Sequence, residues 1–350
     1  MSNSNAYNTG KIFDGYMGRN VIINGNCNIA QRSSITLTTG QGGYGGPDRY
    51  TASNAASAGG SFTQSTGTIT YNGVSRFAVL QTVNTAISSV ATGNYWAGIT
   101  QQTEGINSFH LLGQPISVSF IFNTNVTGTY SVALRDGTGS NCYITTFSAT
   151  ANTPTRYTFN IPTLSTSLVI PATNAAGLSI WIGSLNQGTY QTSIVNTWQS
   201  GNFISASGAT NWGLTASNFI AVAELQIEEG AIVTPFEREA YGITYLKCQR
   251  YFQSAAGSTF VASGTAASTT FAYMQIPIGC QLRTTPTVSF TGTPQLYGST
   301  AGPVNVASIT TIYYSGSFLG VQANVASGLT VGQGQMFYTS TGTLLISSEY

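Results

Sequence analysis

Charge is the scarcest property of this chain. Only 6% of its 350 residues are charged and the formal net charge is +1, whereas roughly a quarter of the residues in an average soluble protein are charged. A nucleic-acid partner requires a stripe of Lys and Arg that displaces counterions from the phosphates. The 11 basic residues are scattered along the chain, so the sequence argues against nucleic-acid binding.

Histidine and usable carboxylates are also scarce. The single histidine, His110, cannot form a histidine pair or triad, and no G-x-S-x-G motif presents a nucleophile. Glycoside hydrolysis requires two carboxylates at a defined separation. Five of the ten acidic residues lie within residues 224–239 and two lie near the termini, which leaves Asp48, Glu104 and Asp136. We therefore predict that the chain is not an enzyme and uses no cofactor, with glycan cleavage as the open alternative.

Long apolar runs and an export signal are missing as well. No apolar run approaches the ~18 residues needed to cross a bilayer, so we predict no membrane insertion. The first 30 residues lack the basic-then-apolar order of a signal peptide, which predicts synthesis in the cytoplasm without Sec-type export. The four cysteines show no metal-type spacing, so we predict free thiols and no metal site.

What the chain does have is a strong strand pattern. Clear period-2 alternation occurs at residues 116–122, 130–134, 156–161 and 178–182, which is typical of β-strands. Gly, Asn and Pro turn signals separate these segments, and such an order favours an antiparallel jelly-roll β-sandwich over a parallel α/β sheet. Trp181 lies in the last of these strands, and we interpret it as a core residue.

A change in pattern near residue 230 indicates a domain boundary. Ala223, Leu225 and Ile227 alternate with polar residues as in a half-buried strand, Gly230 then breaks the strand, and the only credible helix follows at residues 241–249. The predicted fold class is all-β. We predict an N-terminal arm at residues 1–19, a jelly-roll domain at residues 20–238 and a smaller C-terminal β-sandwich at residues 239–350.

Several motifs follow one another in the order of a known family. The stretch from Glu224 to Phe252 contains ELQIEEG, TPFE and CQRYF. It resembles a junction of the tail-fibre and receptor-binding proteins of tailed bacteriophages. Two residues depart from the family's pattern within the matches that follow: Tyr50 occupies a position where the family has Trp, and Gln114 occupies a position where it has Lys. Further matches are Asn20–Gly25 with Ile29–Arg32, Asp48–Tyr50, Gln101–Gly105, Leu112–Phe120, Thr197–Asn202 and Leu344–Tyr350.

The resemblance implies a jelly roll similar to carbohydrate-binding modules, and a virion fibre on the tail or head that attaches to a host by binding a cell-surface glycan. It also implies a virion location, a homotrimer, and contacts with other virion proteins through residues 1–19. A surface poor in charge and the missing export signal fit a virus component released by lysis. A capsid decoration or cement protein with a purely structural role is the alternative left open.

Sugar binding typically combines an aromatic platform with amide and hydroxyl groups. Trp96, Trp198 and Trp212 each lie beside Gly or Asn turn residues, and loops on a rigid scaffold concentrate binding residues. We predict these three rings and Asn211 as the glycan-binding residues.

Four charged residues lie in segments that are otherwise uncharged: Arg32, Asp48, Arg49 and Glu104. Buried ions persist in a folded protein when they are paired, so we interpret this set as a structural charge cluster. A ligand or Ca²⁺ role for Asp48 or Glu104 is the alternative, which the shortage of neighbouring carboxylates disfavours.

Overall fold

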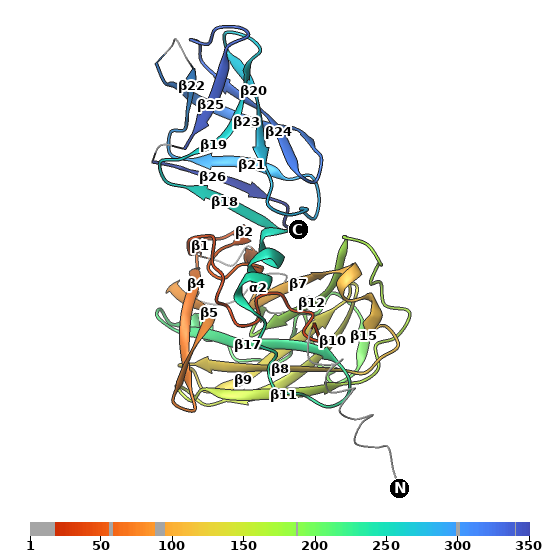
Figure 1. The fold of residues 1–350 in the computed structure, drawn as a ribbon. Helices are drawn as coiled ribbons and strands as arrows, with labels where there is room; N and C mark the ends of the chain where they lie inside the picture. The colour runs from red at the N-terminus through yellow and green to blue at the C-terminus, as the bar shows by residue number, and fades with distance from the viewer. Residues whose placement is uncertain (1–17, 56–58, 88–94, 187, 299–301, 340) are drawn as a thin grey trace. The chain divides into compact units, whose positions relative to one another are not determined.

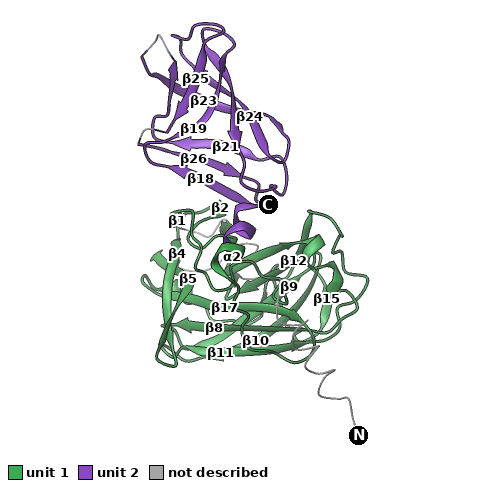
Figure 2. Cartoon of the chain, viewed as in Figure 1, with its two compact units in different colours: residues 1–244 green, residues 245–350 purple. Residues whose placement is uncertain are grey.

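The computed structural model describes residues 18–55, 59–87, 95–186, 188–298, 302–339 and 341–350. The chain divides into two compact units, residues 1–244 (unit 1) and residues 245–350 (unit 2) (Figure 2). Most of the predicted arm falls on residues 1–17, which lie outside the described residues. The sequence predicted a domain boundary after residue 238, and the division of the chain into the two units falls after Thr244, within helix α2 (Tyr241–Gln249).

Unit 1 is a sandwich of two antiparallel sheets, which confirms the all-β class predicted from the alternating segments (Figure 1). In the described residues, the six-stranded sheet has the order β1 (Ile35–Leu37), β4 (Ser61–Tyr71), β5 (Val74–Thr85), β17 (Phe219–Glu229), β8 (Ile116–Thr124) and β11 (Thr155–Ile161). The nine-stranded sheet has the order β13 (Leu185–Asn186), β6 (Tyr95–Trp96), β3 (Tyr50–Ala55), β7 (Ile99–Glu104), β12 (Ala176–Ile182), β9 (Gly128–Arg135), β10 (Asn141–Ala149) and β15 (Trp198–Ser200), with β2 (Gln41–Tyr44) paired to β3.

Shorter elements complete unit 1. The strands β14 (Gln191–Thr192) and β16 (Ser205–Ala206) form a parallel pair. Single 3₁₀ turns are η1 (Gly105–Asn107), η2 (Phe109–Leu111) and η3 (Trp212–Leu214). No helix among the described residues is long and apolar enough to cross a membrane.

The core of unit 1 lies between the two sheets. Strand alternation brings Phe120 and Phe122 of β8 together with Tyr130 of β9 and Phe147 of β10, and each of these side chains is at most 7% exposed. The ring of Phe122 lies 4.9 Å from that of Tyr130 and 5.0 Å from that of Phe147. Because each aromatic side chain buries roughly 150–250 Å², these rings supply much of the apolar burial that stabilises the sandwich.

A buried carboxylate interrupts the central strand of the six-stranded sheet. The pairing of β17 with β8 shifts register around Glu224, which has a φ of 49° and is 3% exposed. Its carboxylate accepts hydrogen bonds from Arg76 (2.8 Å), Arg238 (2.6 Å) and Arg156. These arginines come from β5, the linker after β17, and β11. One carboxylate therefore connects three strands of the sheet and the linker.

The start of the described chain completes this bulge. Leu225 N donates to Gly25 O (2.9 Å), and Leu225 O accepts from Asn20 Nδ2 (2.9 Å). Glycine is required at position 25 because an added Cβ would lie 2.1 Å from Leu225 O. The backbone amides of Gly18 and Asn20 also donate to the Glu237 carboxylate. The N-terminal segment is thus tied both to β17 and to the linker that follows it.

Unit 2 begins within helix α2. This helix confirms the one predicted at residues 241–249. The strands of unit 2 confirm that a smaller β unit follows the sandwich. In the described residues, a three-stranded sheet has the order β18 (Phe252–Ala256), β26 (Thr343–Ser347) and β21 (Thr287–Thr291). A closed barrel has the order β19 (Phe260–Ala266), β20 (Phe271–Pro277), β24 (Phe318–Val325), β23 (Val304–Tyr314), β22 (Gln295–Gly298) and β25 (Gly334–Tyr338), and it closes because β19 pairs with both β20 and β25.

Replacing Glu224 with Gln tests the constraint in the six-stranded sheet. The variant keeps the side-chain size but leaves Arg76 and Arg156, 17% and 24% exposed, without their carboxylate. Removing one partner of a buried ion pair costs about 3–5 kcal/mol, and we expect the free energy of unfolding of unit 1 to fall by that amount. Urea unfolding followed by tryptophan fluorescence measures it, because all four tryptophans belong to unit 1.

Arg238→Ala is the matched control for this experiment. The Arg238 side chain is 68% exposed, and exposed ion pairs contribute about 0–1 kcal/mol. Equal stabilities of the Glu224→Gln and Arg238→Ala variants would contradict the assigned role of the carboxylate.

Candidate functional site

Two of the three predicted platform residues are buried, so the prediction that they present exposed rings is wrong. The side chains of Trp96 and Trp212 are both 0% exposed and meet edge to face, with ring centroids 6.0 Å apart. Trp96 also lies 5.1 Å from Phe62, and Trp212 donates from Nε1 to Gly183 O at 2.8 Å. Contacts between segments distant in the sequence, strand β6 and the turn η3, place both rings in the core.

The other two predicted residues are also engaged by the protein. Trp198 is half-buried, packs against the core of unit 1 and lies 5.6 Å from the ring of Tyr143. Asn211 accepts a hydrogen bond from Gly213 N at 3.1 Å through its side-chain oxygen and so caps the turn η3. Capping satisfies a backbone donor at the start of a helical turn, which gives Asn211 a local structural role.

The predicted charge cluster begins with Asp48, which is 2% exposed. Its carboxylate accepts hydrogen bonds from Gln31 N (3.0 Å) and Gln31 Nε2 (2.6 Å), and Arg32 Nη1 lies 4.0 Å from Asp48 Oδ1. Burial raises the pKa of Asp48 above its ordinary value, although the Gln31 hydrogen bonds and the positive charges of Arg32 and Arg49 act in the opposite direction.

The remaining members of the charge cluster are buried too. Arg49 is 1% exposed and donates to Gln102 O at 2.7 Å, and Glu104 is 0% exposed. Across the described residues, no three His, Cys, Asp or Glu side chains gather in a way that could hold a metal ion. These contacts are those of buried polar groups that hold neighbouring strands together.

A different set of side chains is partly exposed on the nine-stranded sheet. Alternation along β12 sends Leu178, Ile180 and Ile182 into the core between the sheets and turns Ser179 and Trp181 to the opposite face. Trp181 is half-buried on that outer face and packs there against a second core cluster, which contains Ala133, Cys142, Ile144 and Ala206. Trp181 therefore contacts a core cluster, as interpreted, but lies outside the main core between the sheets. Its indole Nε1 donates to Ser179 Oγ at 3.2 Å, which fixes the ring on the sheet.

Three rings lie together at this position. Tyr95 of β6 lies 6.2 Å from Trp181 and 5.1 Å from Tyr190, and both contacts are edge to face. All three side chains are half-buried. We use the name outer-face patch for these rings and the polar side chains beside them: Tyr95, Gln102, Arg135, Trp181, Tyr190 and Asn202.

Strand register places the polar members of the outer-face patch. Ser179 of β12 is opposite Gln102 of β7 on one side and Arg135 of β9 on the other. The Arg135 guanidinium carbon lies 5.1 Å from the Trp181 ring centroid, a cation–π contact. Its Nη2 donates to Gly139 O at 2.9 Å and to Asn202 Oδ1. These contacts hold the guanidinium in a fixed orientation beside the indole.

Part of the Arg135 guanidinium is buried in this arrangement. Its Nε atom is buried and has no hydrogen-bond partner among the described residues. Burial lowers the pKa of Arg135, while the electrostatic effects of Cys142, Tyr95 and Asp136 act to raise it. An arginine stays charged under such conditions, so the patch places a cation beside the Trp181 ring.

The outer-face patch suits a ligand that combines apolar faces with hydroxyl or other acceptor groups. Aromatic rings supply rigid apolar surface, while a few positioned polar groups orient the ligand. The alternation of residues 178–182 already separated Trp181 from the Leu and Ile side chains, and that signal could have identified its face. The approach of Tyr95 and Tyr190 depends on tertiary contacts, for which the sequence offered no local signal.

No protein-family model matches the sequence, and no curated protein matches it. Among solved structures, the chain is similar to the enzymatically active domain of bacteriophage CBA120 tailspike protein 4, with 12% identity, a TM-score of 0.28, and coverage of 61% of this chain and 22% of that one. It is also similar to the family 11 carbohydrate-binding module of a Clostridium thermocellum cellulosomal cellulase, with 9% identity, a TM-score of 0.27, and coverage of 60% and 95%.

A third similar structure is the CBM22-1 xylan-binding domain of Paenibacillus barcinonensis, with 10% identity, a TM-score of 0.29, and coverage of 58% and 100%. The chain spans 22% to 25% of the length of the tailspike domain, an α-L-arabinofuranosidase and an exo-β-agarase that it also matches. The comparisons therefore find distant structural similarity to carbohydrate-binding modules and a phage tailspike domain.

Replacing Trp212 with Ala tests the corrected assignment. Truncating a buried Trp typically costs about 3–5 kcal/mol, and we expect the free energy of unfolding of unit 1 to fall by this amount in urea unfolding. Leu214→Ala is the control, because Leu214 lies on the same turn but is 50% exposed. A Trp212→Ala variant as stable as Leu214→Ala would contradict the core assignment.

Proposed function

We propose that this chain is a bacteriophage virion fibre protein, on the tail or head, that attaches the particle to its host by binding a cell-surface glycan. The observation that carries the proposal is the outer-face patch, in which three half-buried rings contact one another and Arg135 lies against one of them, Trp181. The order of phage-like motifs along the sequence supports the virion assignment.

Binding at the outer-face patch requires little rearrangement of the protein. Trp181 is held by Ser179 and Arg135, and Tyr95 is held between the rings of Trp181 and Tyr190. In the proposed complex a sugar ring packs its C–H face on the accessible part of these half-buried rings, and its hydroxyl groups bond to polar side chains of the patch. Side chains fixed before binding lose little conformational freedom, which favours affinity.

The proposal includes no catalysis. Glycoside hydrolysis uses two carboxylates on either side of the scissile bond, and Asp136 is the carboxylate next to Arg135 in the sequence. It accepts hydrogen bonds from Asn141, Thr138 and Val169 N. Burial acts to raise the pKa of Asp136, but these hydrogen bonds outweigh it and lower the pKa below its ordinary value. Asp136 thus stays ionised and engaged in its turn.

Replacing Trp181 with Ala tests the proposed attachment. Stacking of a flat ligand on an aromatic ring contributes about 1–3 kcal/mol, by analogy with base–aromatic stacking, so we expect a loss of glycan affinity of roughly tenfold or more. A glycan array screened with the whole protein identifies the ligand, and calorimetry with that ligand measures the loss. Purified protein should also block phage adsorption, and the variant should block it less well.

Phe77→Ala is the matched control, because Phe77 is an exposed aromatic residue (53%) on β5 of the other sheet. It should bind the glycan and block adsorption as the native protein does. Unchanged affinity in Trp181→Ala would reject the outer-face patch as the site. Stoichiometric coverage of the capsid lattice without any effect on adsorption would favour the decoration or cement protein instead.

We also propose that the fibre is a homotrimer anchored in the virion through residues 1–19. An interface depleted of charge is buried without a large desolvation cost, and the composition provides such surfaces. Because Gly18 and Asn20 bond to Glu237, deleting residues 1–17 should leave the fold intact. We expect light scattering to give a trimer mass for both the native chain and the chain that lacks residues 1–17. We expect the truncated chain to be lost from phage particles. A monomer mass, or normal incorporation of the truncated chain, would contradict the respective proposal.

A further inference from the structure

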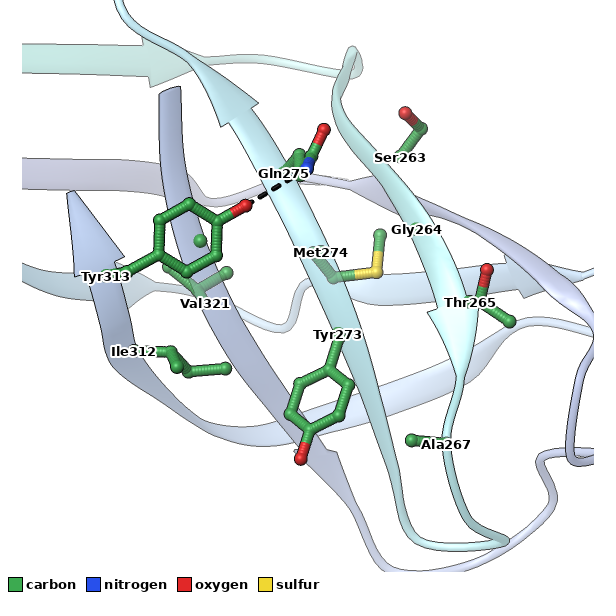
Figure 3. A pocket seen from close by; sticks show the side chains of 11 residues that line it. Ser263, Gly264, Thr265, Ala267, Tyr273, Met274, Gln275, Ile312, Tyr313 and Val321 are labelled. Carbon is green, nitrogen blue, oxygen red and sulfur yellow. Dashed lines mark hydrogen bonds between the residues drawn. The ribbon is translucent and has the colours of Figure 1, made fainter. Parts of the chain in front are cut away.

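The barrel of unit 2 carries a pocket of about 780 Å³ at strands β19, β20, β24 and β23 (Figure 3). The rings of Tyr273 on β20 and Tyr313 on β23 stand on its walls and are 50% and 44% exposed. Large exposed aromatic side chains on a small barrel are a cost to solubility unless they serve a contact. Their position around a hollow, rather than on a flat face, points to a ligand.

A glycine and a β-bulge form the hollow. Gln275, Gly320 and Tyr313 occupy neighbouring register positions on β20, β24 and β23. The Tyr313 ring lies over Gly320, where an added Cβ would approach it to 2.0 Å. The Tyr313 hydroxyl accepts a hydrogen bond from Gln275 Nε2 at 3.0 Å (Figure 3). Because Gly320 has no side chain, the Tyr313 ring fits over it, and Gln275 holds that ring in place.

The bulge adds a second apolar side chain beside this ring. The pairing of β23 with β24 shifts register between Thr311 and Tyr313, which leaves Ile312 as an additional residue that is 49% exposed. Bulges of this kind redirect side chains and occur next to binding sites. Ile312 and Tyr313 consequently both line the pocket although they are adjacent in the sequence.

Hydroxyl groups with unused capacity line the other side of the pocket. Ser263, Thr265 and Tyr273 contribute hydroxyls for which the described structure contains no intramolecular hydrogen bond. Figure 3 shows Ser263 and Thr265 on β19, the strand next to Tyr273. Each hydroxyl can donate one hydrogen bond and accept others. With the Gln275 amide, the pocket offers several neutral donors and acceptors around two aromatic rings.

The absence of charge narrows the ligand class. None of the described residues that line the pocket is Asp, Glu, Lys, Arg or His, and the sequence contains none of these at 251–282 or at 284–348. A charged ligand entering such a site would lose hydration without gaining a partner. The ligand that matches ring faces, hydroxyls and an amide without charge is a neutral polyhydroxyl compound.

We propose that this pocket is a second binding site, specific for a neutral oligosaccharide. Tyr273 and Tyr313 provide the stacking faces, and Ser263, Thr265 and Gln275 provide the hydrogen bonds. The inference stands apart from the function proposed for the outer-face patch, because all of these residues belong to unit 2 and Trp181 belongs to unit 1.

The test uses the full chain and two pocket variants. Gly320→Ala forces the Tyr313 ring away from Gln275 while keeping every lining side chain, and Tyr273→Ala removes an exposed ring. The protein is screened on an array of neutral and acidic oligosaccharides, and captured neutral ligands are titrated by calorimetry. We expect each variant to weaken binding of a neutral oligosaccharide about tenfold or more. Phe318→Ala, an exposed barrel residue (48%) outside the pocket lining, should bind as the native chain does.

Trp181→Ala separates this site from the outer-face patch. The pocket is supported if Trp181→Ala still binds the neutral oligosaccharide and Gly320→Ala does not. Binding of the oligosaccharide to the pocket should leave the tryptophan fluorescence unchanged, because every tryptophan is in unit 1. The proposal is overturned if no neutral oligosaccharide on the array binds in a Gly320-dependent way, or if acidic ligands bind there more tightly. It is also overturned if Tyr273→Ala lowers the oligomer mass by light scattering, because the pocket is then a contact between copies of the chain.

Discussion

The carboxylate of Glu224 is the constraint on which the architecture of unit 1 depends. It sits where β17, the strand between β5 and β8, departs from regular pairing. A bulge leaves backbone groups outside the ladder, and buried backbone groups need partners. Gly25 and Asn20 supply those partners for Leu225, while three arginines surround the carboxylate. These contacts connect the N-terminal segment, the central strand and the linker to one another.

Charged residues are few in the whole protein, and half of the acidic ones are buried. Five of the ten acidic residues are at most 3% exposed and serve the interior: Asp48, Glu104, Asp136, Glu224 and Glu228. The surface is left to hydroxyls, amides and aromatic rings, so recognition rests on short-range packing and hydrogen bonding. Such contacts are much less sensitive to salt than exposed ion pairs, which are screened within about 10 Å at 0.1 M salt. A protein of this composition is suited to contacts that persist as ionic conditions change.

Local sequence patterns predicted several strands and the helix, but they did not predict which aromatic rings come together at the candidate site. Period-2 alternation identified β8, β9, β11 and β12 of unit 1, and the helix predicted at residues 241–249 is α2. The alternation of residues 178–182 also separates Trp181 from Leu178, Ile180 and Ile182, although we interpreted Trp181 as a core residue from its place in that strand. Trp96 and Trp212 sit beside turn residues, but their burial comes from contact with each other and with Phe62 across the fold. Ring positions of this kind depend on which distant strands pair, and that information is not local.

The outer-face patch of unit 1 and the pocket of unit 2 share one feature. Each holds an aromatic ring in place with a polar neighbour and leaves part of the ring accessible: Arg135 lies beside Trp181, and Gln275 lies beside Tyr313. Fixed rings bind with a small entropic cost, yet one stacking contact contributes only about 1–3 kcal/mol. Modest sites become effective when they are linked, because the second binding event is then intramolecular. Two binding sites on one chain, repeated in the proposed trimer, would give lasting attachment without any single site of high affinity.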